Sequence, residues 1–348
     1  MKTPRLEEVF NQLLSQNRPF VFYRLPKSKT VHCFFQEDQT LNSTPALKVE
    51  GFVMSRFDAP LPAVYISNKN HLEFDAPTQC HRAGIPSFQQ EKSEKEAFTT
   101  LVQKTLKAIE NGRLKKLVVA RKINLQRTVD PVVLFSNLCA LYSQAMVYFW
   151  YHPKAETWVG ATPEQLFSVR SSRLTTMALA GTMTRNEKEE YQWGRKEVAE
   201  QKWVKDTLFA QLQDLFLSGS IQCSKTHTKS AGNLVHLCNE LSVDFQNLAL
   251  AEWVAKLHPT PAVGGIPLAE GMSFLQQNEN LDRGYYAGFL GPVTTAGNTE
   301  LFVNLRCAKI SNGQISLYVG AGITKDSDPE QEWEETQNKA KTLWTALP

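Results

Sequence analysis

The stretch that decides the fold runs from Tyr285 to Val319 and reads YYAGFLGPVTTAGNTELFVNLRCAKISNGQISLYV. It contains three segments rich in apolar, β-branched and aromatic residues, and such segments predict strands. Turn residues separate them, and Asn-Gly between two apolar runs is a strong hairpin signal. The predicted strands are Tyr285–Leu290, Glu300–Ile310 and Gln314–Val319, with turns at Gly297-Asn298 and Asn312-Gly313.

Outward from this stretch, helices and strands come in groups and do not alternate regularly. Apolar residues at helical spacing predict a helix at Glu91–Glu110, before the stop signal Asn111-Gly112. The other predicted helices are Leu6–Leu14, Val132–Ser143, Glu187–Leu215, Leu248–Leu257, Leu268–Gln276 and Pro329–Leu347. The other predicted strands are Phe20–Arg24, Ala63–Ile66, Lys116–Arg121, Met146–Trp150, Trp158–Ala161, Leu174–Ala180 and Leu234–Val243, and Asp75–Ser87 is a predicted loop. This order favours an α+β fold with antiparallel sheets over a doubly wound parallel sheet.

Composition excludes several classes of protein. The 348 residues are 42% hydrophobic, which is enough for a large core, and the net charge of +3 comes from interspersed charges without a basic stripe for nucleic acid. The N-terminus is charged and no apolar run approaches the length of a membrane span. Six scattered cysteines without a CxxC pair are typical of reduced thiols. We therefore expect a cytoplasmic protein that binds neither nucleic acid nor a membrane.

Acidic residues on two predicted helices are candidate metal ligands. Glu332 and Glu335 lie three residues apart and share one helical face, and Glu200 lies on the long polar helix. Mg²⁺ is a hard cation that takes a few carboxylates together with water or substrate oxygens. On spacing alone a solvated helix face is the commoner reading, since acidic residues near a helix start also favour the helix dipole.

Five further features could serve an active site, and each also has a purely structural interpretation. Lys116 begins a strand and Glu164 follows one in GATPEQLF; a buried lysine can act as a base and a buried glutamate as an acid. Arg306 in a core strand needs either an ion pair or a substrate carboxylate. The Gly320–Gly322 segment can grip an anion through its N–H groups or form a tight turn. His258 is more often a loop histidine than a catalyst.

Together and in order, eight segments resemble the chorismate-utilising enzymes, the family of isochorismate, salicylate, anthranilate and aminodeoxychorismate synthases. They are KLVVAR (Lys116–Arg121), GATPEQLF (Gly160–Phe167), ALAGT (Ala178–Thr182), AEQKWVKD (Ala199–Asp206), HPTPAVGG (His258–Gly265), ENLDRGYYAGFLG (Glu279–Gly291), GNTELFVNLRCAKI (Gly297–Ile310) and YVGAGITKDSDPEQEWEETQNK (Tyr318–Lys339). The resemblance implies antiparallel sheets packed face to face with helices outside. It also implies a variable front part at 1–90 and a chorismate-binding catalytic region at 91–348, integrated in one domain.

The resemblance further implies chorismate as substrate and Mg²⁺ as cofactor. Glu200 and Glu335 are implied as direct Mg²⁺ ligands, with Glu332 beside them. The residues implied to bind substrate are Gly181, Thr182, His258, Arg306, Gly320, Ala321, Gly322 and Lys339.

Two positions distinguish the members of this family. Water-using members resemble this chain in having lysine at Lys116, whereas anthranilate synthases have glutamine there, so no glutamine amidotransferase subunit is expected. Many aminodeoxychorismate synthases carry a lysine nucleophile where this chain has Ala180. The HPTPA segment is closer to isochorismate synthases, of the menaquinone or siderophore type, than to salicylate synthases. Salicylate synthase and a non-catalytic chorismate-binding protein stay open as alternatives, and a monomer or weak dimer is expected.

The chemistry implied is a hydroxyl transfer around the ring. Neutral Lys116 takes a proton from water that attacks C2, and Glu164 protonates the hydroxyl that leaves C4. The ordinary pKa is about 10.4 for lysine and about 4.3 for glutamate, so both groups must be moved toward neutrality, which burial does.

Overall fold

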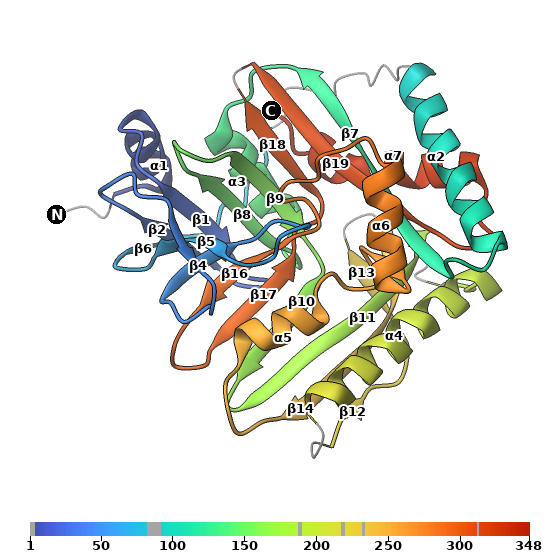
Figure 1. The fold of residues 1–348 in the computed structure, drawn as a ribbon. Coiled ribbons are helices and arrows are strands. Elements are labelled where there is room, and N and C mark those ends of the chain that lie inside the picture. Colours follow the sequence, from blue (N-terminus) through green and yellow to red (C-terminus); the bar gives the residue numbers. More distant parts are fainter. Residues whose placement is uncertain (1–3, 82–91, 187–189, 217–219, 232–233, 312) are drawn as a thin grey trace.

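The computed structural model describes residues 4–81, 92–186, 190–216, 220–231, 234–311 and 313–348, and within them two large antiparallel sheets form the fold (Figure 1). In order across the first sheet, sheet A, the strands are β15 (Gly265–Ile266), β7 (Lys116–Gln126), β19 (Gln314–Ile323), β18 (Cys307–Ser311), β9 (Thr157–Thr162), β8 (Met146–Tyr151), β1 (Phe20–Arg24), β2 (Thr30–Phe35) and β6 (Asn70–Asp75). In order across sheet B they are β12 (Gln222–Cys223), β14 (Leu234–Asp244), β11 (Arg173–Thr184), β10 (Gln165–Arg170), β17 (Thr299–Val303), β16 (Phe289–Val293), β4 (Gly51–Met54), β5 (Ala63–Ser67) and β3 (Asn42–Thr44), with β13 (His227–Ala231) also paired to β14. The predicted α+β fold with antiparallel sheets is confirmed.

Helices pack against both sheets. They are α1 (Leu6–Ser15), α2 (Lys92–Glu110), α3 (Pro131–Leu141), α4 (Arg195–Leu215), α5 (Leu250–Leu257), α6 (Leu268–Asn278) and α7 (Pro329–Trp344). Helices α1, α3 and α7 share one hydrophobic cluster with sheet A, while α4 packs against β11 and β14 of sheet B. No helix in the described part of the chain combines the length and the apolar character that a membrane crossing requires.

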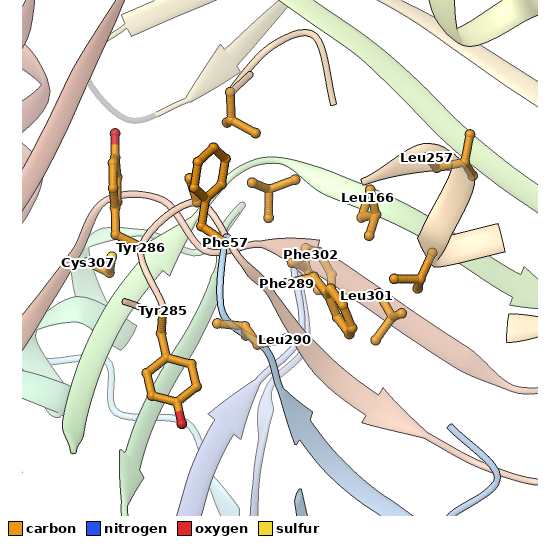
Figure 2. Packing of buried hydrophobic residues seen from close by; sticks show 14 of the residues in the cluster. Phe57, Leu166, Leu257, Tyr285, Tyr286, Phe289, Leu290, Leu301, Phe302 and Cys307 are labelled. Carbon is orange, nitrogen blue, oxygen red and sulfur yellow. The ribbon is translucent and has the colours of Figure 1, made fainter. Parts of the chain in front are cut away.

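Strand β1 shows why the sheets have two buried faces. Its sequence FVFYR is apolar without alternation, and every residue in it is buried. Successive side chains point to opposite faces. Phe20 and Phe22 therefore join the cluster under α1 and α3, whereas Val21 and Tyr23 join the cluster between the sheets. There the ring of Tyr23 lies 5.0 Å from that of Phe52 on sheet B. Figure 2 shows another part of this inter-sheet core, around Phe289, Leu301 and Phe302.

The stretch from Tyr285 to Val319 departs from two predictions. The predicted strand Tyr285–Leu290 is wrong in its first half, because residues 284–288 form a turn in which Ala287 has φ +60°, and β16 begins at Phe289. The single strand Glu300–Ile310 is also wrong. It is two strands, β17 in sheet B and β18 in sheet A. The chain changes sheet at residues 304–306, where Arg306 has φ +48°.

The buried side chain of Asn304 holds this change of sheet in place. Its Oδ1 accepts a hydrogen bond from the Tyr148 hydroxyl at 2.7 Å, and its Nδ2 donates to the carbonyl of Tyr285 at 2.9 Å. Arg306 therefore lies at the junction of the sheets and not within a core strand as predicted.

Most other elements match their predictions to within a few residues. The β18–β19 hairpin is confirmed by the pairing of Ser311 with Gln314, although Asn312 itself lies outside the described residues. The helix predicted from Glu187 begins later, at Arg195; residues 187–189 lie outside the described residues and 190–194 are not helical. Residues 82–87 of the predicted loop Asp75–Ser87 also lie outside them, as does Glu91, whereas Asp75 ends β6 and residues 76–81 are neither helix nor strand, as predicted for a loop. Strands without a counterpart in the prediction are β2, β3, β4, β6, β10, β12, β13 and β15.

Candidate active site

One cavity gathers most of the predicted site residues at the junction of the two sheets with α4 and α7. Among the residues that line it are Lys116, Glu164, Gly181, Thr182, Glu200, Arg306, Gly320, Gly322, Glu335 and Lys339. They come from β7 and β19 of sheet A, from the β9–β10 connection, from β11 of sheet B, from the β17–β18 connection and from both helices. Segments more than 200 residues apart in sequence thus meet in one place.

Lys116 and Glu200 form a buried ion pair in this cavity. The Lys116 side chain is 1% exposed, and its Nζ lies 2.8 Å from Oε1 of Glu200, which is 13% exposed. Gly322 makes room for the pair, since a Cβ at this position would lie 2.7 Å from Oε1 of Glu200 and 3.2 Å from Cε of Lys116. A contact under 3.0 Å forces some atom to move, so the glycine allows the carboxylate to approach the strand.

Glu164 is a buried acid in the same cavity. Burial raises its pKa to about 7, because a desolvated carboxylate loses its hydration. A hydrogen bond from Thr260, with Oγ1 3.3 Å from Glu164 Oε1, and the charges of Lys116, Lys339 and Arg306 act in the opposite direction. The carboxyl group can therefore carry or release a proton close to neutral pH, as a general acid or base must.

Two further cations face the cavity. Arg306 is 8% exposed, and its Nη1 donates to Oγ1 of Thr342 at 2.8 Å. Lys339 donates from Nζ to the carbonyl oxygen of Gly320 at 2.9 Å and pairs with Glu335 at 2.6 Å. In the antiparallel ladder a residue's C=O and N–H point to the same side. The C=O and N–H groups of Gly320 therefore both point toward the side where Lys339 lies and away from β7.

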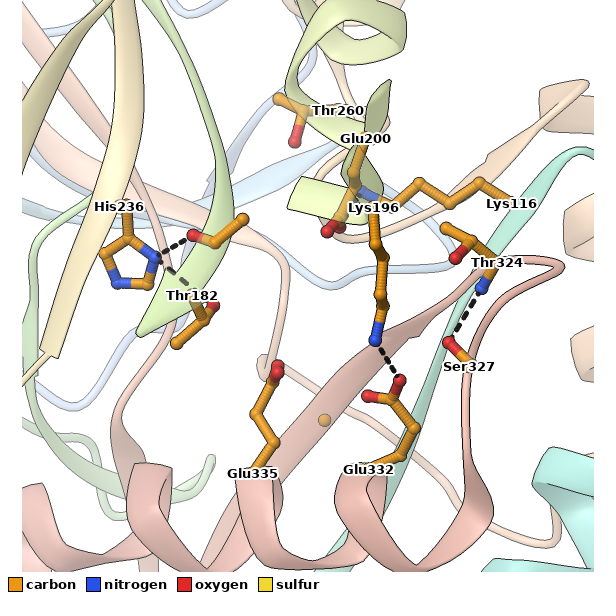
Figure 3. A network of polar contacts seen from close by, with 12 residues as sticks. Lys116, Thr182, Lys196, Glu200, His236, Thr260, Thr324, Ser327, Glu332 and Glu335 are labelled. Carbon is orange, nitrogen blue, oxygen red and sulfur yellow. Dashed lines mark hydrogen bonds and ion pairs between the residues drawn. The ribbon is translucent and has the colours of Figure 1, made fainter. Parts of the chain in front are cut away.

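Glu332 and Glu335 rise from one face of α7 toward α4 (Figure 3). Helix α7 begins there because Asp328 caps it, accepting hydrogen bonds from the N–H groups of Glu330 and Gln331 at 3.0 Å, and Pro329 occupies the first turn. Glu332 lines a neighbouring groove that includes Thr182 and Glu335. Burial and the charge of Glu335 raise the pKa of Glu332.

The donor set of Glu200, Glu332 and Glu335 fits a hard cation. Each carboxylate is paired with a lysine, Glu332 with Lys196 at 2.6 Å, and the three are not gathered within 4.8 Å of one another in the described chain. Mg²⁺ commonly takes one or two carboxylates and completes its octahedron with water and substrate oxygens. The residues present are therefore suited to hold it without all three converging.

The sequence analysis missed several residues at this cavity, and His236 on β14 is the most informative. Its Nδ1 lies 2.8 Å from the carbonyl oxygen of Gly181 and 3.4 Å from Oγ1 of Thr182, both on β11. Burial and the nearby charge of Arg306 lower its pKa to about 3, so the imidazole is neutral. A histidine inside the apolar run LVHLC was the available signal. Tyr286 and Tyr318 also line the cavity.

Two of the residues implied as substrate contacts, His258 and Ala321, are not among the residues that line the cavity. The ring of His258 packs between those of Phe57 and Phe289, with centroids 6.4 and 5.6 Å away, and is not among the residues that line the cavity. Burial lowers the pKa of His258 to about 4. Ala321 is fully buried on the strand between two lining glycines, and its side chain faces away from the cavity.

The sequence model of the family described as "Chorismate binding enzyme" matches residues 60–348. The chain belongs to this family. The isochorismate synthase MenF of Escherichia coli is 31% identical over 263 residues, which cover 73% of this chain and 61% of the relative. Component 1 of the anthranilate synthase of Aquifex aeolicus is 27% identical over 274 residues, covering 75% of this chain and 55% of the relative.

A solved structure has the same fold. The structure of MenF, the menaquinone-specific isochorismate synthase from Escherichia coli, aligns with a TM-score of 0.80 at 21% identity and covers 95% of this chain and 89% of that one. The matched curated relatives are longer, since the alignments span only about 55–61% of their length. The structural match covers 95% of this chain and therefore extends into residues before 60, where the family model does not match.

Proposed function

We propose that this chain is an isochorismate synthase, an isomerase that converts chorismate to isochorismate. The observation that carries the proposal is that Lys116 and Glu164 line one buried cavity together with the cations Arg306 and Lys339. Relatives named isochorismate synthase support it, from Escherichia coli and Bacillus subtilis and, for salicylate biosynthesis, from Pseudomonas aeruginosa.

In the proposed reaction, Lys116 acts at C2 of the ring and Glu164 acts at C4. Each moves one proton, and the double bonds shift between these two carbons. Neutral Lys116 takes a proton from the water that attacks C2 of the ring. Glu164 gives its proton to the hydroxyl that leaves C4 as water, while the double bonds shift between the two carbons. The product has the same composition as the substrate, and the two side chains exchange roles in the reverse direction.

Lys116 and Glu200 are direct partners in the cavity. The Lys116 side chain is 1% exposed, and its Nζ lies 2.8 Å from a carboxylate oxygen of Glu200. Glu200 and Glu335, with Glu332 beside them, are the proposed ligands of Mg²⁺. The ion would supply positive charge for the ring carboxylate of chorismate.

The remaining groups would orient the substrate. Arg306, Lys339 and the backbone of Gly320–Gly322 are proposed to hold the pyruvyl carboxylate, since charge-assisted hydrogen bonds are the strong ones. Gly181 and Thr182 would line the ring. Gly181 has φ +70°, and a Cβ there would lie 3.0 Å from Cβ of Glu197, so the turn that carries Thr182 favours glycine at this position.

A product assay tests the proposal directly. The protein is incubated with chorismate and Mg²⁺, and the products are separated on a column. Isochorismate is the expected main product. Salicylate together with pyruvate would identify a salicylate synthase instead, and tight chorismate binding without turnover would identify a non-catalytic binding protein; either result would overturn the proposal.

A further inference from the structure

A second group of ligating side chains lies on β2 and β6, at the edge of sheet A far from the catalytic cavity in the strand order. In the antiparallel register His32 pairs with Glu73, and Phe34 pairs with His71. Residues two apart on a strand point to the same face. His32, His71 and Glu73 therefore share one face as a direct cross-strand pair and its diagonal neighbour.

Three atoms of this group form a compact triangle. Nδ1 of His32 lies 3.1 Å from Nε2 of His71 and 3.3 Å from Oε1 of Glu73, and the third side, from His71 Nε2 to Glu73 Oε1, is 3.6 Å. Within the described chain this is the one set of three such ligand atoms that lie within 4.8 Å of one another.

The triangle has the dimensions of one face of a tetrahedral zinc site. Zinc binds histidine nitrogen at about 2.0–2.1 Å and carboxylate oxygen at about 2.0–2.2 Å. In a regular tetrahedron of that size, ligand atoms are about 3.3–3.5 Å apart. The three observed separations bracket this value, so one point lies at bonding distance from all three atoms.

Aromatic neighbours fix the two imidazole rings before any ion binds. The ring of Tyr23 stacks on that of His32 with centroids 5.1 Å apart, and the ring of Phe34 meets that of His71 edge to face at 4.9 Å. The site is nevertheless open to solvent, since the side chain of Glu73 is 58% exposed. A cation can therefore enter, and water can complete its coordination.

We propose that His32, His71 and Glu73 bind a zinc-type divalent cation that joins the edge strand β6 to β2. Imidazole nitrogen favours zinc and its neighbours in the transition series over Mg²⁺, so this site differs in ligand chemistry from the three glutamates of the catalytic cavity. Because β6 ends sheet A and has a strand on one side only, the ion ties its outer strand to the rest of the sheet.

The test compares Zn²⁺ binding by the chelator-treated full chain and by variants, with Mg²⁺ present throughout. Calorimetry is expected to show one Zn²⁺ more per wild-type chain than per His71→Ala chain, and Glu73→Gln weakens this site at least about tenfold. The matched controls, His227→Ala and Glu110→Gln, alter exposed residues elsewhere and keep the wild-type stoichiometry. At Zn²⁺ about one hundred times its Kd, wild type gains about 3–4 °C in Tm, and His71→Ala does not.

Cobalt supplies a spectroscopic readout that does not depend on activity. Co²⁺ in the wild-type chain is expected to give the intense visible absorption of four-coordinate nitrogen ligation, and His71→Ala removes it. The proposal is overturned if wild type and His71→Ala bind equal amounts of Zn²⁺ with equal affinity, or if the cobalt spectrum is the same in both. Neither result would bear on the isomerase reaction, which is assayed separately.

Discussion

The Nζ atom of Lys116 on β7 lies 2.8 Å from Oε1 of Glu200 on α4. The proposed base and a proposed metal ligand are therefore direct partners, although 84 positions separate them in the sequence. This contact would link the proposed metal site to the proposed base, because a cation bound by Glu200 would compete with the Lys116 side chain for the same carboxylate.

The first prediction concerns the two proposed proton carriers. Glu164→Gln keeps the shape of the side chain, and Lys116→Gln replaces the amine with a shorter neutral amide; neither variant can accept or donate the required proton. Each is expected to lower kcat for isochorismate formation at least about 10²-fold, the usual contribution of a general acid or base. The measurement is steady-state turnover, with Tm to check the fold.

Neighbouring residues supply the controls for these variants. Lys115→Gln alters the exposed lysine next to Lys116, and Glu110→Gln removes an exposed carboxylate at the end of α2; both should keep wild-type kcat. Wild-type turnover in Lys116→Gln or Glu164→Gln would refute the assigned role of that residue.

The second prediction concerns the pH dependence of stability that Glu164 creates. Burial raises its pKa from 4.5 to about 7, so the folded protein retains the proton more strongly than the unfolded chain. Its contribution to stability is fully present below pH 4.5 and is lost as the pH rises through about 7. Urea unfolding from pH 5 to 8 should show wild type losing up to about 3 kcal/mol relative to Glu164→Gln. A difference that does not change with pH would contradict the buried, protonated state.

Sequence patterns predicted several elements correctly because those elements have local signals. FVFYR at 20–24 is a continuous apolar strand, and the structure gives it the same bounds. The glycines of VGAGI and the acids of EWEET were also found, and the structure places Gly320, Gly322 and Glu335 at one cavity.

Local patterns could not reveal where the chain changes sheet. The pattern around Leu305-Arg306-Cys307 is apolar on both sides and predicts one continuous strand. In the structure β17 and β18 belong to different sheets, and the buried hydrogen bonds of Asn304 stabilise the change from one sheet to the other. The pairing of each proposed metal-binding glutamate with a lysine could not be predicted from local patterns either. Lys116 and Glu200, for example, are in contact only in the folded chain. His236 was missed because both faces of its strand are apolar, which removes the alternation that would mark it.

The third prediction concerns the metal site. Glu335→Ala is expected to raise the Mg²⁺ concentration needed for half-maximal activity at least about tenfold, or to abolish activity, because a proposed ligand is lost. Glu334→Ala, which alters the adjacent exposed glutamate, should leave the Mg²⁺ titration unchanged. The same titration curve for Glu335→Ala and wild type would exclude Glu335 as a ligand.

The fourth prediction tests the close approach at Gly322. In Gly322→Ala the new Cβ would lie 2.7 Å from Oε1 of Glu200, so the carboxylate must move and its ion pair with Lys116 must lengthen. The expected result is a fall in kcat of at least about tenfold with a small change in Tm, since the surrounding strands need not move.

A double-mutant cycle separates this clash from a general disturbance of β19. In a Glu200→Ala background the carboxylate is absent and only the looser approach to Cε of Lys116, at 3.2 Å, remains, so Gly322→Ala should lower any remaining activity much less than in wild type. Interaction of this kind is expected only for residues in contact, whereas independent effects add. Full additivity of the two substitutions would mean that Gly322 acts on the reaction by a route other than the position of Glu200.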